Sequence, residues 1–159
     1  MGSDQYQFNF DELDELYREV ILDHYRNPRN KISLASPDIE KESFNPFCGD
    51  DIILQLKISK NGTIEDIGFQ GQGCSISQSS ASMLTSLVKN QTIKTALKTS
   101  NIFSNLIQGH EPTPEELDKL GDLEVLSGIK KFPVRIKCAL LAWVTLEEAI
   151  EAYKEPDSN

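Results

Sequence analysis

The sequence has few cysteines, no excess of positive charge and no long hydrophobic run. Three cysteines among 159 residues are too few, and odd in number, for a fold organised by disulfides. Acidic residues outnumber basic ones by 25 to 16, and the net charge of −9 argues against general electrostatic binding of nucleic acid. The longest run of aliphatic and aromatic residues, 139–144, has six members, whereas a membrane-spanning helix needs about 18. The first residues also lack the basic and apolar regions of a secretory signal. We therefore expect a cytoplasmic protein with free thiols and no membrane contact.

Residues 51–70 carry the pattern of a β-hairpin. Hydrophobic residues alternate with polar ones along its first strand, which is typical of a strand with one buried face: Ile52, Leu54, Leu56 and Ile58. The next four residues, 60–63, predict a tight turn, because Asn61-Gly62 tolerates the positive φ angles of a type I′ turn. The return strand, 63–70, alternates less cleanly, so we expect a bulge or an early end. The polar stretch 29–43 is interpreted as an irregular connection.

Helices are predicted on both sides of this hairpin. Hydrophobic residues recur at helical spacing over about 10–26 and again from about Pro133 to Tyr153, and a Ser-rich helix follows Cys74. Residues of about 100–120 resemble an insertion, and Thr113 begins a capping box for a further helix. Helices combined with antiparallel strands predict an α+β fold. We expect one domain over 1–159, with flexible tails at 1–8 and 154–159.

Three cysteines and one aspartate lie at the edges of predicted elements, where side chains from different segments converge. Cys48 and Asp50 point to the same side of an extended segment. Cys74 precedes the Ser-rich helix and Cys138 lies near the start of the last helix, and a helix N-terminus favours the thiolate form of a nearby cysteine. Three thiolates and one carboxylate form a tetrahedral set that Zn²⁺ accepts. The oxygen ligand is the weaker contact in such a set, so this site could open.

The residues alone leave a second interpretation open. A free cysteine often behaves as a small buried hydrophobe, and the spacing of these cysteines fits no local zinc-finger signature. Arg135 and Lys137 either offset the negative charge of a metal site or are ordinary surface charges. His24 lies on the apolar face of the first helix and is expected to be hydrogen-bonded and half-buried. His110 is expected to be solvated.

Four motifs, in order, carry a resemblance to a known family. They are Asp23-His24-Tyr25-Arg26-Asn27-Pro28-Arg29-Asn30, Asn45-Pro46-Phe47-Cys48-Gly49-Asp50-Asp51, Gly73-Cys74-Ser75-Ile76-Ser77 and Phe132-Pro133-Val134-Arg135-Ile136-Lys137-Cys138-Ala139. With these motifs the chain resembles the IscU/NifU N-terminal superfamily from about Leu13 to Tyr153. The scaffold branch of that superfamily has a histidine where this chain has Lys137. That difference and the longer stretch before the third cysteine resemble the SufU branch of Gram-positive bacteria.

The resemblance implies a small antiparallel sheet of about three strands packed against several helices. It also implies one zinc ion per chain, bound by Cys48, Asp50, Cys74 and Cys138. Cys48 would accept persulfide sulfur from a SufS-type cysteine desulfurase, a PLP enzyme, and the protein would act as a sulfurtransferase that supplies downstream iron–sulfur assembly proteins. Arg135 and Lys137 are candidates for supporting the ligands or docking the partner.

Two other functions remain open at this point. One is an IscU-like scaffold that assembles a [2Fe–2S] cluster on the same four residues. The other is a non-catalytic binding module in which zinc only stabilises the fold.

Overall fold

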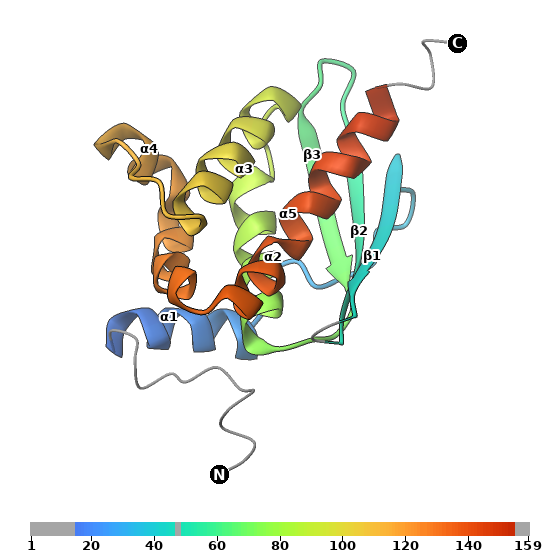
Figure 1. Cartoon of the computed structure of the whole chain (residues 1–159). Coiled ribbons are helices and arrows are strands. Elements are labelled where there is room, and N and C mark those ends of the chain that lie inside the picture. The colour runs from blue at the N-terminus through green and yellow to red at the C-terminus, as the bar shows by residue number, and fades with distance from the viewer. Residues whose placement is uncertain (1–14, 47–48, 155–159) are drawn as a thin grey trace.

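The computed structural model of the chain describes residues 15–46 and 49–154. Its elements follow the order α1 (Glu15–Arg26), β1 (Ile39–Asn45), β2 (Asp50–Ile58), β3 (Ile64–Gln70), α2 (Ser75–Val88), α3 (Ile93–Ile107), α4 (Pro114–Leu120), the 3-10 helix η3 (Gly121–Lys131) and α5 (Pro133–Lys154). Figure 1 shows the sheet on one side of the molecule, with α2 and α5 next to it and α4 on the far side. The predicted α+β class and the three-stranded sheet are confirmed.

The sheet is antiparallel, with the order β1-β2-β3. Along β2 every second residue is buried, because one face of the strand lies against the core. The predicted hairpin is confirmed, since Gly62 in the following turn has a φ of 83° and its N–H donates to the carbonyl of Ser59. Asn61 does not have a positive φ, so the turn is not the expected type I′. The pairing of β2 with β3 shifts register between Lys57 and Ile58, which is the bulge that the weak alternation predicted.

Strand β1 corrects the expectation of an irregular connection over 29–43. Its sequence is largely polar and charged, and only Ile39 and Asn45 at its two ends are buried. The strand forms because its backbone pairs with β2 at the edge of the sheet, where a hydrophobic pattern is not required. Residues 39–45 therefore carry no alternating hydrophobic pattern from which a strand could be predicted.

The loop before β1 lies against β3. Asn30 accepts a backbone hydrogen bond from Phe69 at 3.0 Å, and the backbone of Ile32 occupies the space where a side chain at position 68 would stand. Gly68 is therefore required for this close approach. The loop continues along α2, where the Nδ2 of Asn30 donates to the hydroxyl of Thr85 at 3.1 Å.

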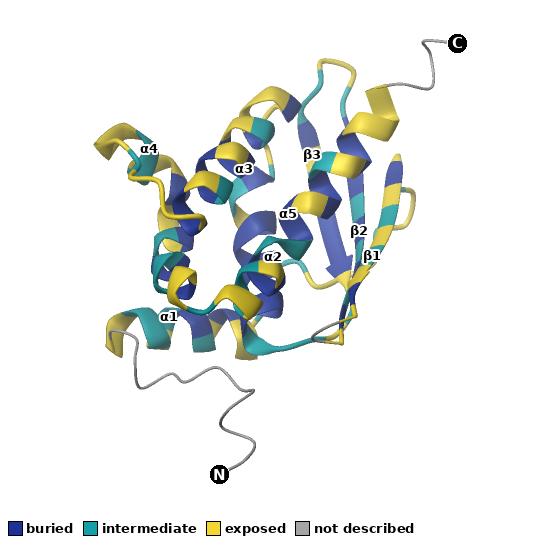
Figure 2. Ribbon diagram, in the orientation of Figure 1, coloured by how far each residue is buried: buried dark blue, intermediate teal, exposed yellow. Residues whose placement is uncertain are grey.

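The core lies between the sheet and the helices, as the burial colours of Figure 2 show. Helix α2 is buried over most of its surface, because it is surrounded by other elements, and its buried residues include Ser77, Ser79, Ser80 and Ser82. Phe103 of α3 and Trp143 of α5 pack with their ring centroids 5.6 Å apart. Helix α3 was not predicted, whereas α4 begins at Thr113 with the predicted capping box.

A hydrogen-bonded network joins α1, α2 and η3. The Nδ1 of His24 lies 2.8 Å from the hydroxyl of Ser82, and its Nε2 lies 2.9 Å from a carboxylate oxygen of Asp122. The backbone N–H of Arg29 donates to the same hydroxyl at 2.8 Å. The hydroxyl of Ser82 thus contacts both His24 and the backbone of Arg29, and His24 links Ser82 of α2 to Asp122 of η3. His24 is buried rather than half-buried as expected, and its two ring nitrogens are both partnered.

No helix within the described ranges is both long and apolar enough to cross a membrane.

Candidate metal centre

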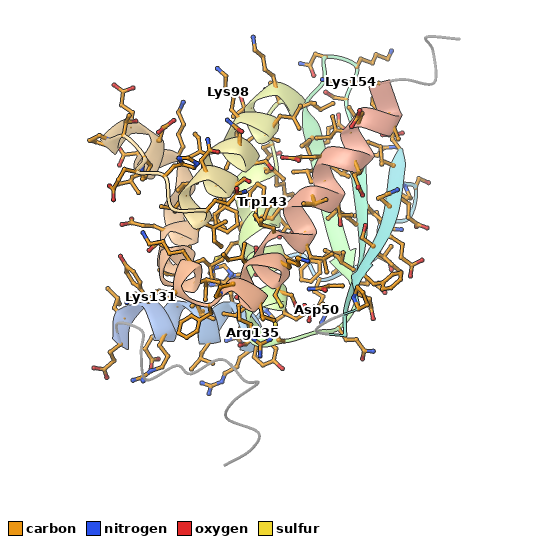
Figure 3. All side chains as sticks on the ribbon, in the orientation of Figure 1. Asp50, Lys98, Lys131, Arg135, Trp143 and Lys154 are labelled. Atoms are coloured by element: carbon orange, nitrogen blue, oxygen red, sulfur yellow. The ribbon has the colours of Figure 1, made fainter. Side chains whose placement is uncertain are left out.

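Three metal-binding side chains that are far apart in the sequence meet at one end of the sheet. A carboxylate oxygen of Asp50 and the sulfurs of Cys74 and Cys138 all lie within 4.8 Å of one another. Asp50 begins β2, Cys74 caps α2, and Cys138 lies in the second turn of α5. Figure 3 shows Asp50 at the same end of the molecule as Arg135, and Lys98 and Lys154 at the opposite end.

The carboxylate of Asp50 is buried, with one oxygen bonded and the other left for a ligand. Its Oδ1 accepts the backbone N–H of Cys74 at 2.9 Å. Its Oδ2 is fully buried and has no hydrogen-bond partner in the described structure. A Cβ atom at Gly73 would overlap with this carboxylate, so glycine at that position leaves room for Asp50. A buried carboxylate normally has a charged partner or coordinates a metal.

Cys74 is the N-cap residue of α2. Its sulfur accepts the backbone N–H of Ser77 at 3.5 Å, which places the sulfur at the positive end of the helix. A hydrogen bond from Cys138 is the largest influence on the pKa of Cys74 and lowers it to about 6, although burial raises it. The thiolate, which is the form that binds metals, therefore predominates at neutral pH.

Cys138 is fully buried, and its sulfur receives two side-chain donors. The Nδ2 of Asn45, at the end of β1, lies 3.9 Å from the sulfur, and the Nη1 of Arg135, one turn earlier in α5, lies at the same distance. The carbonyl oxygen of Val134 lies 3.8 Å away and can accept from the thiol when it is protonated. A cationic and a neutral donor thus hold the sulfur of Cys138 in place.

These observations together indicate a metal-binding centre. Among the described residues the other buried side-chain atom without a partner is the Nε1 of Trp143, whose ring packs against Phe103 in the core. Asp50, by contrast, has an unpartnered Oδ2 and belongs to a residue cluster that includes two cysteine sulfurs. The donor set suits a divalent metal ion that binds both sulfur and oxygen.

The sequence-predicted residues fall into three groups. Asp50, Cys74 and Cys138 are brought together, whereas Cys48 lies outside the described residues, so its role as a ligand and as sulfur acceptor stays a prediction. Arg135 contacts the sulfur of Cys138, while Lys137 is exposed and lines an apolar groove of about 320 Å³ between β1 and α5.

Sequence reasoning assigned no role to Asn45, although it stands in the motif that contains Cys48 and Asp50. The available signal was a polar residue just before Pro46, at the end of the segment that leads to the first cysteine. Its contact with Cys138 depends on strand β1, which was not predicted.

A match to a known protein family includes the three clustered residues. The family model described as NifU-like N terminal domain matches residues 16–139, which include Asp50, Cys74 and Cys138. The chain belongs to the NifU-like N terminal domain family. Within that family, it is 50% identical over 147 residues to the zinc-dependent sulfurtransferase SufU of Bacillus subtilis, and the match covers 92% of this chain and 96% of that one.

Two further members of the family show the range of functions that it contains. The chain is 41% identical to the iron-sulfur cluster assembly scaffold protein IscU of Streptococcus pyogenes serotype M1, over 88% of this chain and 86% of that one. A crystal structure of a putative iron-sulfur cluster assembly scaffold protein for the SUF system, from Fervidobacterium islandicum AW-1, superimposes with a TM-score of 0.76 at 29% identity. That match covers 83% of this chain and 94% of the other.

Proposed function

We propose that this protein is a zinc-dependent sulfurtransferase that accepts persulfide sulfur from a SufS-type cysteine desulfurase for iron–sulfur cluster assembly. The observation that carries the proposal is the cluster of Asp50, Cys74 and Cys138, in which the Oδ2 of Asp50 is buried and without a partner. The 50% identity to a protein named as a zinc-dependent sulfurtransferase supports the same reaction. Free thiols fit a reducing compartment, and we propose that the protein works in the cytoplasm.

The residues present fit a zinc ion. Zinc binds sulfur at about 2.3 Å and carboxylate oxygen at about 2.0–2.2 Å, so two ligand atoms of a tetrahedral site lie roughly 3.5–3.8 Å apart. The three described donor atoms lie within 4.8 Å of one another, which small side-chain adjustments bring into this range. Cys48 is proposed as the fourth ligand. When bound, zinc keeps the thiols deprotonated and holds their lone pairs.

The proposed transfer is an exchange between a thiolate and a persulfide. In the form in which it is not bound to the metal, the sulfur of Cys48 attacks the outer sulfur of the persulfide on the desulfurase, and a new bond forms between these two atoms. The bond between the outer and inner sulfurs of the donor breaks, and the inner sulfur leaves as a thiolate. The outer sulfur keeps its proton, so the step consumes no oxidant or reductant. Asp50 holds the loop before α2 in place throughout, because its Oδ1 accepts the N–H of Cys74.

The experiment that tests the proposal measures turnover of the desulfurase with and without this protein. Zinc-loaded protein is expected to accelerate cysteine turnover and to carry a persulfide, while metal-free protein is expected to be much less effective and to recover when zinc is returned. Absence of acceleration by the zinc-loaded protein contradicts the proposal. Unfolding on removal of zinc, without any acceleration by the loaded form, favours the module in which zinc only stabilises the fold.

The second candidate is a scaffold that assembles a [2Fe–2S] cluster on the same residues. The relative from Streptococcus pyogenes, which is named as a scaffold protein, favours it. A stable visible absorbance after reconstitution with iron and sulfide, together with transfer of the cluster to an apo-protein, would select the scaffold. A colourless zinc protein that accelerates the desulfurase would select the sulfurtransferase.

A further inference from the structure

One buried polar side chain at the metal centre belongs to none of the proposed ligands. Asn45 is 6% exposed, and its Nδ2 lies 3.9 Å from the sulfur of Cys138, a residue 93 positions later in the chain. Buried amide groups are normally hydrogen-bonded, because leaving water without a partner costs free energy. The amide of Asn45 is therefore directed into the metal centre and donates to one of its sulfurs.

The backbone of Asn45 contacts two further parts of the same centre. Its carbonyl oxygen accepts the N–H of Gly49 at 3.0 Å, which closes the connection between β1 and β2. Across the sheet, Asn45 is the register partner of Asp50. One residue thus joins the turn that leads to Asp50, the strand that carries Asp50 and the sulfur of Cys138.

The two described sulfurs differ in how they are supported. Cys74 receives the backbone N–H of Ser77, which belongs to its own helix, and a hydrogen bond from Cys138 of α5. Cys138 receives side-chain donors, and of these Arg135 is on the same helix while Asn45 comes from the sheet. Asn45 is therefore the donor that fixes the sulfur of Cys138 relative to Asp50.

We infer that Asn45 is a positioning residue that keeps Cys138 as a metal ligand and prevents it from acting as the sulfur acceptor. Its amide holds the fully buried sulfur near Asp50. The donated N–H also withdraws electron density from the sulfur and makes it a poorer nucleophile, so a persulfide is attacked by another thiol. Supporting partners of this kind orient metal ligands and tune their donor strength. The inference rests on the metal site of the proposed function, but not on transfer from a desulfurase.

The test is a titration of the full-length chain with Co²⁺, which reports sulfur ligation by its charge-transfer absorption. In Asn45→Leu, which keeps the size of the side chain and removes the donor, the affinity for Co²⁺ is expected to fall about 10–100-fold. The charge-transfer band is expected to move to lower energy, because the sulfur has lost a stabilising hydrogen bond. Thr145→Val is the matched control, since Thr145 is buried on the same helix and bonds only to the carbonyl of Leu141 in the contacts described. It is expected to change neither quantity.

Unchanged affinity and an unshifted band in Asn45→Leu would overturn the inference. If Asn45→Leu does not fold, Asn45→Asp serves instead, because it keeps the shape and places a carboxylate beside the sulfur, and the affinity should again fall. In a Cys138→Ser background, substitution of Asn45 should cause no further spectral shift, and an additional shift would show that Asn45 acts through another ligand. Failure of the wild-type protein to stimulate a desulfurase would contradict the proposed function and leave these cobalt measurements unaffected.

Discussion

Two polar clusters contact α2, and they differ in whether a buried polar atom is left without a partner. In the first, both ring nitrogens of His24 are bonded, to Ser82 and to Asp122. In the second, Asp50 is equally well buried and lies in a cluster with the sulfurs of Cys74 and Cys138, but its Oδ2 has no partner. A polar network in which every buried atom has a partner stabilises a fold. A buried polar atom without a partner destabilises the fold unless a ligand bonds to it. The first cluster is thus assigned to stability and the second to metal binding.

The substitution with the largest expected effect is one that removes the sulfur acceptor. In the proposed function, Cys48→Ala removes the thiolate that attacks the persulfide, so stimulation of the desulfurase should fall to the level seen without this protein. The rate of sulfide release from cysteine in the presence of a reductant measures it. Thr145→Val, which alters a buried hydroxyl in α5 away from the metal centre, should stimulate like wild type. Normal stimulation by Cys48→Ala would show that another residue accepts the sulfur.

Asp50→Asn should move metal affinity and metal-free stability in opposite directions. The amide retains an oxygen that can accept the N–H of Cys74, but it removes the buried negative charge that binds the metal. We expect zinc affinity to fall at least ~10-fold, and the metal-free protein to become more stable to urea by about 1–3 kcal/mol. A competition titration with a chelating dye and urea unfolding of the metal-free protein measure the two quantities. A less stable metal-free variant would mean that the Oδ2 of Asp50 is satisfied without a metal.

His24→Ala should lower the stability of the fold and leave the zinc affinity almost unchanged. Loss of the ring leaves Ser82 and Asp122 without their shared partner, and the free energy of unfolding should fall by about 1–3 kcal/mol. The zinc affinity of the folded protein should stay within about twofold of wild type, because His24 is not among the clustered metal donors. Exposed His110 provides the control, since His110→Ala should change neither quantity. A large loss of zinc affinity in His24→Ala would show that the two clusters are coupled.

The smallest effect is expected at the exposed ion pair of Asp23 with Arg29. The hydrogen bond from Arg29, 2.7 Å long, lowers the pKa of Asp23 below its ordinary value of 3.8. A carboxyl whose pKa is lower in the folded state stabilises the fold above the ordinary pKa, and this contribution is lost as the pH falls through the lowered value. Asp23→Asn should therefore unfold at a slightly lower urea concentration at pH 6, and the difference from wild type should shrink below about pH 3.8. A difference independent of pH would exclude the ion pair as its cause.

The sequence predicted those elements whose formation depends on local pattern. The alternating hydrophobic residues of β2, the Asn61-Gly62 turn, the capping box at Thr113 and the last helix all appear where they were expected. Strand β1 was missed because it is held by hydrogen bonds to β2 and not by a hydrophobic face of its own. Helix α3 was also not predicted, because part of it lies in a region of the chain that was interpreted as an insertion.

The sequence predicted which residues form the candidate site, but it did not predict how they are arranged. Thiols and a carboxylate at the edges of elements indicated a metal site, and the motif resemblance selected the same residues. The sequence did not reveal that Oδ1 of Asp50 is used by Cys74 while Oδ2 is left unpartnered, because this depends on how α2 meets the sheet. The role inferred for Asn45 was hidden for a related reason, since it depends on the end of a strand that the sequence pattern did not show.

The separation of the three described donors along the chain has a consequence for the order of folding. Asp50 and Cys74 are 24 residues apart, and Cys138 follows 64 residues later. In an unfolded chain, bringing such distant groups around one ion carries a large entropic cost of loop closure. Pairing of β2 with β3 and docking of α5 bring these donors together in the folded chain, so we expect metal uptake to follow the formation of this tertiary structure.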